Sequence, residues 1–453
     1  CIEDEIPFEL PEGWEWCRVR DIAAVKGGKR LPKGVGFSPC RTAHAYIRVT
    51  DMKNHCINTD DLKYISEEVF LQIKNYTISK DDLYVTIAGT IGVTGEVPTE
   101  LDGMNLTENA VKITNIQINK NYLCLIIQSE FVQQQFQDKT HQVAMPKLAL
   151  ERILSTLIPV CTITTQSAMV SKFVEMDSLI NQIREEKEIL AETVSLTKSK
   201  ILDLAIRGKL VPQNPDDEPA SVLLERIRAE KEELIKAGKI KRDKKESIIF
   251  KGDDNSYYEK VGVEIRCIDS EIPFEIPDGW MYERLGNICS IARGGSPRPI
   301  ENYLTDDENG LNWIKIGDTE QGGKYIYSTK EKIRPEGLSK TRYVCSGDFL
   351  LTNSMSFGRP YILRTNGCIH DGWLVIGGIE IAFHQDYLYY MLSSSIMYNA
   401  LSSLAVGSTV KNLKSDSVKS LLVPIPPLAE QACISRQIEN YFATMLPIER
   451  SLS

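Results

Sequence analysis

The chain has 453 residues, of which 42% are hydrophobic and 25% charged, and its net charge at pH 7 is −9. This length predicts about three domains, and the composition is that of a globular protein with buried cores. No run approaches the ~20 apolar residues of a membrane span, and the acidic opening does not resemble a signal peptide. The eleven cysteines form no Cys-x-x-Cys pair. These features exclude a membrane protein, a disulfide framework and a zinc ribbon, so we expect a cytoplasmic protein.

Although the net charge of the chain is negative, a segment near its start is basic. Between Trp16 and Thr50 there are eight Lys or Arg residues, and the one acidic residue is Asp21. Phosphates respond to the charge within a Debye length of ~10 Å, not to the charge of the whole protein. The net charge therefore does not exclude binding to nucleic acid.

An internal repeat organises the whole chain. Residues 1–14 (CIEDEIPFELPEGW) return as 267–280 (CIDSEIPFEIPDGW), with ten of fourteen positions identical. The match continues at an offset of 263 to 267, for example between Asp82 and Asp348 and between Gln166 and Gln431. This period is far too long for a solenoid, so we predict a duplicated domain.

Each copy alternates strand-like and helical patterns. Strand-like runs occupy Asp82–Ile87 and Asp348–Thr352. Helical apolar spacing covers Leu123–Phe136 and Tyr387–Leu401. This mixture predicts a fold of the α/β class in each copy.

A long helix is predicted between the copies. From Gln166 to Leu204 apolar residues recur at heptad spacing, with two polar interruptions and no Pro or Gly. A second helix is expected from Ala220 to about Ala237, and then a mobile charged linker over Lys239–Glu246. The heptad restarts after the second copy, where Pro447 should kink or end the helix near Leu446.

The two heptad helices are expected to pair as a long antiparallel coiled coil, because such a helix cannot bury its apolar stripe alone. The residues expected at this helix-pair or subunit interface are Phe173, Met176, Ile180, Ile183, Leu190, Val194, Ile438, Tyr441 and Met445. The predicted domains are a first α/β domain over residues 1–165, a helical spacer over 166–250 with a linker to about 265, a second α/β domain over 266–428, and a C-terminal helix over 429–453.

Each copy carries a basic loop with two adjacent glycines at the same place, Lys26–Lys33 and Arg293–Arg298. Glycine lets backbone N–H groups approach phosphates, Lys and Arg neutralise them, and Arg also reads guanine. Loops that differ between the copies suit the readout of different bases. A solvated surface hairpin is the alternative for the basic loops. The candidate DNA-binding residues are Lys26, Gly27, Gly28, Lys29, Arg30, Lys33, Arg48, Thr90, Gln142, Lys147, Arg293, Gly294, Gly295, Ser296, Arg298, Lys315, Ser356, Arg359, Ser408, Thr409 and Lys411.

Motifs for catalysis are absent from the sequence. It contains neither the [DNS]-P-P-[YF] motif of amino-methyltransferases nor the G-x-x-x-x-G-K-[ST] phosphate loop. A nuclease site built from Asp216, Asp243 and Lys245 would lie in charged helical or linker sequence. The five histidines show no metal-ligand spacing. We therefore expect no catalytic residue, metal or cofactor in this chain.

Several long motifs, in order along the chain, resemble the specificity subunits of type I restriction–modification systems. They are the repeated Ile-Pro-Phe-Glu-(Leu/Ile)-Pro-x-Gly-Trp opening, Arg284–Pro297 after it, Ile201–Gln213 in the central helical region and Val423–Gln431 at the end of a domain. The resemblance covers essentially the whole chain. The first copy departs from the pattern at Val160–Gln166, and the short C-terminal helix would weaken a second methyltransferase contact.

The resemblance implies a non-catalytic subunit that selects DNA sequence. In this family two target-recognition domains stand at the ends of a two-helix spacer, and each reads half of a split site in double-stranded DNA. The helices bind two methyltransferase subunits that carry S-adenosylmethionine, and restriction subunits add translocation and cleavage with ATP and Mg²⁺. The alternatives are a fused DNA methyltransferase or nuclease, and a duplicated adaptor scaffold that does not bind DNA.

Overall fold

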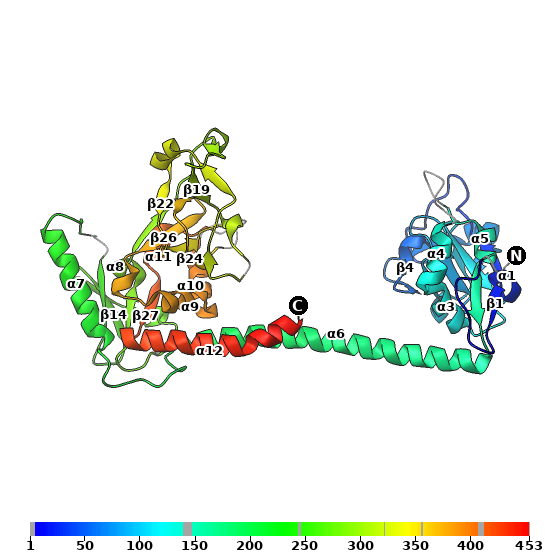
Figure 1. Ribbon diagram of the computed structural model, residues 1–453, viewed down its shortest axis with the longest axis horizontal. Helices are drawn as coiled ribbons and strands as arrows, with labels where there is room; N and C mark the ends of the chain where they lie inside the picture. The colour runs from blue at the N-terminus through cyan, green and yellow to red at the C-terminus, as the bar shows by residue number, and fades with distance from the viewer. Residues whose placement is uncertain are drawn as a thin grey trace. The chain divides into compact units, whose positions relative to one another are not determined.

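The computed structural model describes residues 5–138, 147–242, 246–320, 322–354, 357–405 and 412–452 (Figure 1). The chain forms two compact units, residues 1–185 and 186–453. Each unit contains one copy of the sequence repeat. Among the described helices, none combines the length and the apolar character needed to cross a membrane.

The described part of the first unit holds two four-stranded sheets, a short hairpin of β4 (Met52–Lys53) and β5 (Cys56–Ile57), and a two-stranded pair. The sheets have the strand orders β2-β11-β8-β9 and β6-β3-β10-β7. The pair joins the ends of the domain, because β1 (Glu15–Arg18) lies antiparallel to β12 (Leu157–Val160). The sheet strands are β2 (Ala24–Gly27), β3 (His44–Ile47), β6 (Lys63–Ile65), β7 (Thr77–Ile78), β8 (Leu83–Thr86), β9 (Thr94–Glu96), β10 (Met104–Leu106) and β11 (Ala110–Thr114).

The second unit repeats this arrangement, which confirms the predicted mixed α/β duplication. Its sheets have the orders β17-β26-β23-β24-β20 and β18-β21-β19-β25-β22, and β16 pairs with β27 as β1 pairs with β12. Each five-stranded sheet adds one edge strand to the order of the first unit. The strands are β16 (Met281–Arg284), β17 (Ser290–Arg293), β18 (Leu304–Thr305), β19 (Leu311–Ile314), β20 (Tyr325–Ile326), β21 (Glu331–Ile333), β22 (Arg342–Val344), β23 (Phe349–Thr352), β24 (Pro360–Leu363), β25 (Gly367–Ile369), β26 (Trp373–Gly377) and β27 (Leu422–Ile425).

The helical stretch predicted in each copy is two helices separated by one serine. In the first unit these are α3 (Lys120–Gln128) and α4 (Glu130–Asp138), and in the second α9 (Gln385–Ser393) and α10 (Ser395–Leu404). Ser394 caps α10 by accepting a hydrogen bond from the Met397 N–H. The helices pack on the sheets, and their apolar side chains share a core with β8 and β11 in the first unit. The predicted strand runs are confirmed as β8 and β23.

Equivalent glutamines close both domains. The side-chain oxygen of Gln166 accepts from the Asn119 N–H (2.9 Å) and that of Gln431 from the His384 N–H (2.8 Å). Each side-chain amide also donates to the carbonyl five residues before it, at 2.7 and 3.1 Å. Both glutamines are fully buried. The sequence departure at Val160–Gln166 therefore leaves this closing contact intact.

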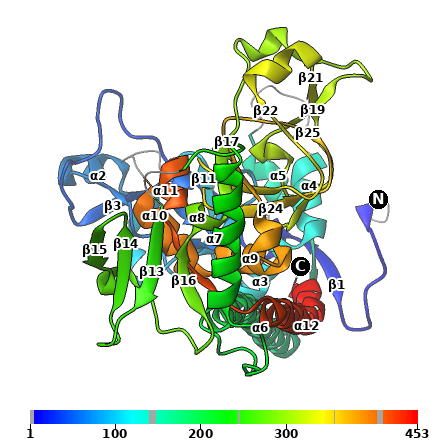
Figure 2. The ribbon, with the colours of Figure 1, turned by 90° about the vertical axis from the view of Figure 1, so that its left-hand side faces the viewer.

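The long central helix is confirmed as α6 (Ile163–Ile206). The C-terminal helix α12 (Leu428–Leu452) continues through Pro447, so of the two expected outcomes, a kink or an end near Leu446, the end is wrong. Proline removes one N–H donor, and near the end of a helix this loss interrupts little of the remaining ladder. In the second unit α12 runs antiparallel to the last part of α6 (Figure 1, Figure 2). Lys198 donates to Glu449 at 2.6 Å.

The helix pair is shorter than the heptads predict. Val194 and Ile438 are buried, and Met445 packs against the same core as Ile438. Tyr441 is 40% exposed. With 25 residues against the 44 of α6, α12 covers only part of the stripe. The expected interface residues that the described chain leaves 42–57% exposed are Phe173, Met176, Ile180, Ile183 and Leu190.

The linker expected between residue 250 and about residue 265 folds instead. After the predicted helix, confirmed as α7 (Ala220–Lys236), the strands β13 (Ser247–Lys251), β14 (Tyr257–Val261) and β15 (Glu264–Cys267) form an antiparallel sheet. The mobile segment expected over Lys239–Glu246 ends before the first of these strands and stays a prediction, and residues 243–245 lie outside the described part of the chain.

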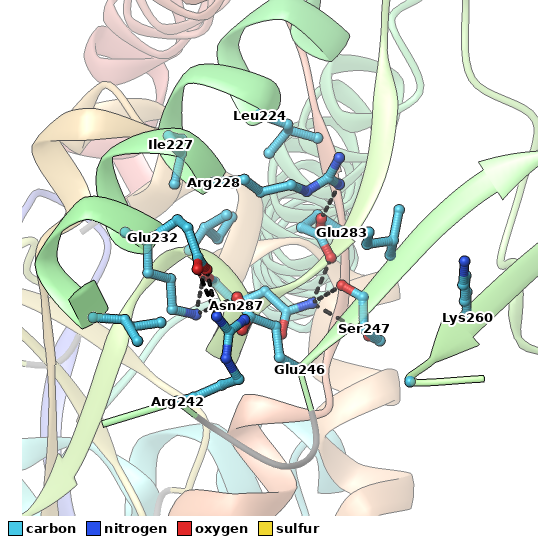
Figure 3. Close-up of a pocket in the computed structure, with 15 residues that line it drawn as sticks. Leu224, Ile227, Arg228, Glu232, Arg242, Glu246, Ser247, Lys260, Glu283 and Asn287 are labelled. Atoms are coloured by element: carbon cyan, nitrogen blue, oxygen red, sulfur yellow. Dashed lines mark hydrogen bonds and ion pairs between the residues drawn. The ribbon is translucent and has the colours of Figure 1, made fainter. Parts of the chain in front are cut away.

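Ion pairs explain why a charged segment is ordered here. A cavity of about 420 Å³ lies between α7 and the sheet, and Figure 3 shows the charged residues along its wall. Arg228 pairs with the buried Glu283 at 2.9 Å, and Arg242 pairs with Glu232 at 2.6 Å. On β14, burial alone would raise the pKa of Glu259, but hydrogen bonds from Arg284 and Ser247 and the Arg284 charge lower it to about 2.

Candidate nucleic-acid interface

The basic loop of the first unit begins at the end of β2 and crosses the end of β10. A Cβ atom on Gly28 would lie 2.0 Å from the Thr107 carbonyl oxygen. The Gly28 N–H donates to the Ala110 carbonyl at 3.1 Å, and the Lys29 N–H donates to the Leu106 carbonyl at 2.9 Å. The basic side chains project from this backbone, and those that are exposed are Lys26, Lys29, Arg30 and Lys33.

The second unit builds its basic loop in the same way. The Gly294 N–H donates to the Trp373 carbonyl at 2.9 Å, and the Gly295 N–H donates to the Ile369 carbonyl at 3.2 Å. A Cβ atom on Gly294 would lie 2.3 Å from the His370 carbonyl oxygen.

These contacts show that the expected role of the glycines, letting backbone N–H groups approach phosphates, is wrong. The N–H groups of Gly28, Gly294 and Gly295 donate within the fold, so they are not aimed at phosphates. Glycine is needed because two backbone segments approach too closely for a side chain. Whether the loops contact DNA stays a prediction, and it rests on their side chains.

In the first unit Arg30 pairs with the Glu108 carboxylate, and two other predicted basic residues, Lys147 and Arg48, lie nearby. Arg30 Nε donates to Glu108 Oε1 at 2.6 Å, and Lys147 Nζ lies 3.2 Å from the Glu108 carbonyl oxygen. Arg30 and Arg48 line one open cavity of about 410 Å³ with Glu108 and Tyr46. Arg48 is held by Asp51 at 2.6 Å, whereas the Arg30 side chain is 79% exposed.

In the second unit the predicted residues converge on Asp371. Arg293 Nε donates to its carbonyl oxygen at 2.9 Å, Ser296 Oγ donates to Oδ1 at 2.8 Å, and Arg298 lies 3.4 Å from Oδ2. Lys315 lines the adjoining cavity of about 650 Å³ with Ser296 and Arg298.

The surroundings of both carboxylates lower their pKa and so favour the ionised form. Burial alone would raise the pKa of Glu108, but hydrogen bonds from Arg30 and Thr107 outweigh it and lower that pKa. Burial likewise opposes ionisation of Asp371, and the hydrogen bond from Ser296 and the nearby charges of His370 and the arginines lower its pKa. Each unit thus presents exposed cations around a fixed anion.

The type I restriction modification DNA specificity domain matches residues 11–192 and 277–452. The chain belongs to this family. The resemblance predicted from the sequence motifs is confirmed, and with it the predictions of a DNA specificity subunit and of a chain that is not an enzyme.

Curated relatives of this specificity chain carry the same description. The EcoEI specificity subunit of Escherichia coli is 24% identical over 97% of this chain and 79% of its own length. The EcoAI specificity subunit of the same species is 28% identical over 64% of this chain and 54% of its own length.

Two solved structures share the fold of the specificity chain. One, described as the structural basis of complex assembly and conformational transition of the type I R-M system, has a TM-score of 0.59 and 16% identity, and the match covers 98% of this chain and 94% of that chain. The other is the HsdS subunit from Thermoanaerobacter tengcongensis, with a TM-score of 0.54 and 17% identity over 99% of this chain and 94% of that chain.

Other predicted contacts of the specificity chain lie elsewhere or cannot be placed. Arg359 lines a separate groove of about 660 Å³ with Ser199 of α6 and Tyr398 of α10. Thr90 sits in the β8–β9 turn, where its carbonyl accepts a hydrogen bond from Thr86. The predicted residues outside the described chain are Gln142, Ser356, Ser408, Thr409 and Lys411.

Sequence reasoning missed Glu108 and Asp371, the residues on which both clusters converge. A search for basic side chains passes over carboxylates, and these two come about 75 residues after their loops. Their position along the chain was an available signal. Each carboxylate comes two residues after a short strand, β10 or β25, and the end of that strand is where the basic loop passes.

Proposed function

We propose that this chain reads an asymmetric, bipartite site in double-stranded DNA for a type I restriction–modification enzyme in the cytoplasm. The observation that supports the proposal best is the repeated geometry: each unit carries exposed cations on a glycine-held loop beside an open cavity. Their side chains differ, with Arg30, Arg48 and Lys147 in one unit and Arg293, Ser296 and Arg298 in the other. Different side chains in the corresponding clusters of the two units suit different half-sites.

We further propose that methyltransferase subunits dock on the exposed stripe of α6. Phe173, Met176 and Ile183 leave an apolar face that a partner helix would cover. S-adenosylmethionine, ATP and Mg²⁺ would then be bound by the methyltransferase and restriction subunits.

Binding of a duplex by the complex of this chain with its methyltransferase subunits tests the proposal. We expect specific binding that weakens steeply with salt, because phosphate contacts release counterions. The double substitution Lys29→Ala with Arg30→Ala should reduce affinity about ten-fold or more at physiological salt and make the salt dependence shallower by up to about two phosphate contacts.

The alternatives give other results. A fused methyltransferase predicts that the chain alone binds S-adenosylmethionine. An adaptor scaffold predicts assembly with partners but no salt-dependent binding to any duplex. Either result would overturn the proposal.

A further inference from the structure

Both units hold an exposed arginine against a carboxylate that is itself fixed in the fold. The Arg30 and Arg298 side chains are 79% and 81% exposed, whereas those of Glu108 and Asp371 are 23% and 28% exposed. The two carboxylates occupy equivalent places, because the residue before each donates the same type of hydrogen bond: the Thr107 N–H donates to the Ile47 carbonyl and the His370 N–H donates to the Ile314 carbonyl.

The carboxylates are anchored by hydrogen bonds other than those to the arginines. Glu108 accepts from the Thr107 hydroxyl at 3.0 Å and from the Tyr46 hydroxyl at 3.3 Å. Asp371 accepts from Ser296 at 2.8 Å, and His370 Nε2 lies 3.0 Å from the same oxygen. Each arginine can therefore move while its carboxylate stays in place.

In the first unit Arg30 pairs with the Glu108 carboxylate through Nε and not through its terminal nitrogens. In the second unit Arg293 uses Nε for the Asp371 backbone carbonyl, whereas Arg298 contacts the Asp371 carboxylate through a terminal nitrogen at 3.4 Å. Guanine is recognised by two parallel N–H donors, which the terminal nitrogens of such an arginine supply. In the first unit the Glu108 carboxylate thus orients the Arg30 guanidinium without competing for the base contact.

A fixed carboxylate also acts against binding to phosphate. An arginine that swings to a phosphate leaves its carboxylate without that partner and close to a second anion. Juxtaposed like charges are unfavourable, and such repulsion is a known route to specificity.

We propose that Glu108 and Asp371 are specificity-determining positioning residues, which hold the loop arginines for base contact and oppose their transfer to phosphates of non-specific DNA. This inference rests on the proposed DNA-reading function. It assigns a role in DNA reading to two acidic residues, whereas the candidate interface was predicted from its Lys and Arg residues.

The substitutions Glu108→Gln and Asp371→Asn test it in the complex with methyltransferase subunits. Each keeps the side-chain shape and removes the charge. We expect binding to a non-specific duplex to tighten by on the order of five-fold and the slope of log affinity against log salt to steepen by about 0.9, because one more phosphate is neutralised. The ratio of specific to non-specific affinity should fall. Methylome sequencing should show relaxed bases in one half-site for Glu108→Gln and in the other for Asp371→Asn.

Each control removes one negative charge from the same unit as its test variant and leaves the basic loop unchanged. Glu151→Gln and Asp416→Asn alter exposed carboxylates that pair with Arg20 and Lys419. Arg30→Ala is a second test variant, and it should lose discrimination without gaining non-specific affinity.

The outcomes distinguish a failure of the positioning role from a failure of the proposed DNA-reading function. If the unaltered complex discriminates between duplexes but the test variants match their controls, or lose specific and non-specific binding alike, the positioning role is wrong. If the unaltered complex does not discriminate at all, the proposed function itself is overturned.

Discussion

Gly28 and Gly294 let the basic loop of each domain cross directly over the end of a neighbouring strand. The neighbouring Gly27 has open space where a Cβ would lie, while the position at Gly28 is filled by the Thr107 carbonyl. The two adjacent glycines of the first loop are therefore not equivalent, although the sequence repeat treats them as a unit.

This difference gives a matched pair of variants. Gly28→Ala should destabilise the first domain by about 1–3 kcal/mol, because the added methyl group forces two backbone segments apart. Gly27→Ala should change stability by no more than about 0.5 kcal/mol. Urea unfolding of the full chain measures both. Equal effects would show that the close approach to Thr107 does not constrain the loop.

The residues of the candidate site were predictable by charge but not by geometry. A search for Lys, Arg and Gly found Arg30, Lys147 and Arg298, which the structure places around two carboxylates. It could not find Glu108 or Asp371, because their proximity depends on strand pairing between distant segments. For the same reason it could not place Arg359, another predicted DNA-binding residue, which lines a groove beside α6.

At the scale of elements, helix periodicity was the most reliable signal. It located α6 and α7 within a few residues, because heptad spacing persists over many turns. It could not give the length of the paired stretch, which depends on where α12 packs. It also missed the sheet from β13 to β15, whose charged surroundings suggest a linker until Arg228, Arg242 and their partners are seen.

The repeat supplies a matched test of which part of the heptad stripe is paired within the chain. Ile438 and Phe173 are equivalent in the repeat, but Ile438 is fully buried and Phe173 is 50% exposed. Ile438→Ala should destabilise the second unit by about 2–5 kcal/mol through the cavity that it leaves. Phe173→Ala should be nearly neutral in the chain alone and should weaken binding of a methyltransferase subunit. Calorimetry of the chain and pull-down of the subunit give the two results, and a large loss of stability in Phe173→Ala would contradict this assignment.

At the scale of the whole molecule, the duplication explains why the sheets of the two units share a common strand order, to which the second unit adds one edge strand in each sheet. Matched contacts at the closing positions, such as Gln166 and Gln431, preserve the frame, while the loops on that frame diverge. Sequence comparison of the copies revealed the duplication and the α/β class. It did not reveal the order of strands, because the parallel pairing of β3 with β10 joins segments that share no local pattern.

The single helix α6 belongs to both units, since the division between them falls at Glu185. We propose that its length sets the gap between the two half-sites. An insertion of seven residues after Glu186, in the exposed part of the helix, adds about 10.5 Å and preserves the helical face to within about 20°. The recognised site should then keep both half-sites and gain about three base pairs of gap, at about 3.4 Å each.

An insertion of five residues at the same point is the control, because it turns one end of the helix by about 140° relative to the other. We expect it to abolish recognition of any bipartite site while leaving the fold of each unit unchanged. Methylome sequencing of strains that carry the two variants gives the answer directly. An unchanged gap in the seven-residue variant would show that the distance between half-sites is set by contacts outside α6, and the helix would then serve only as a docking surface for the modification subunits.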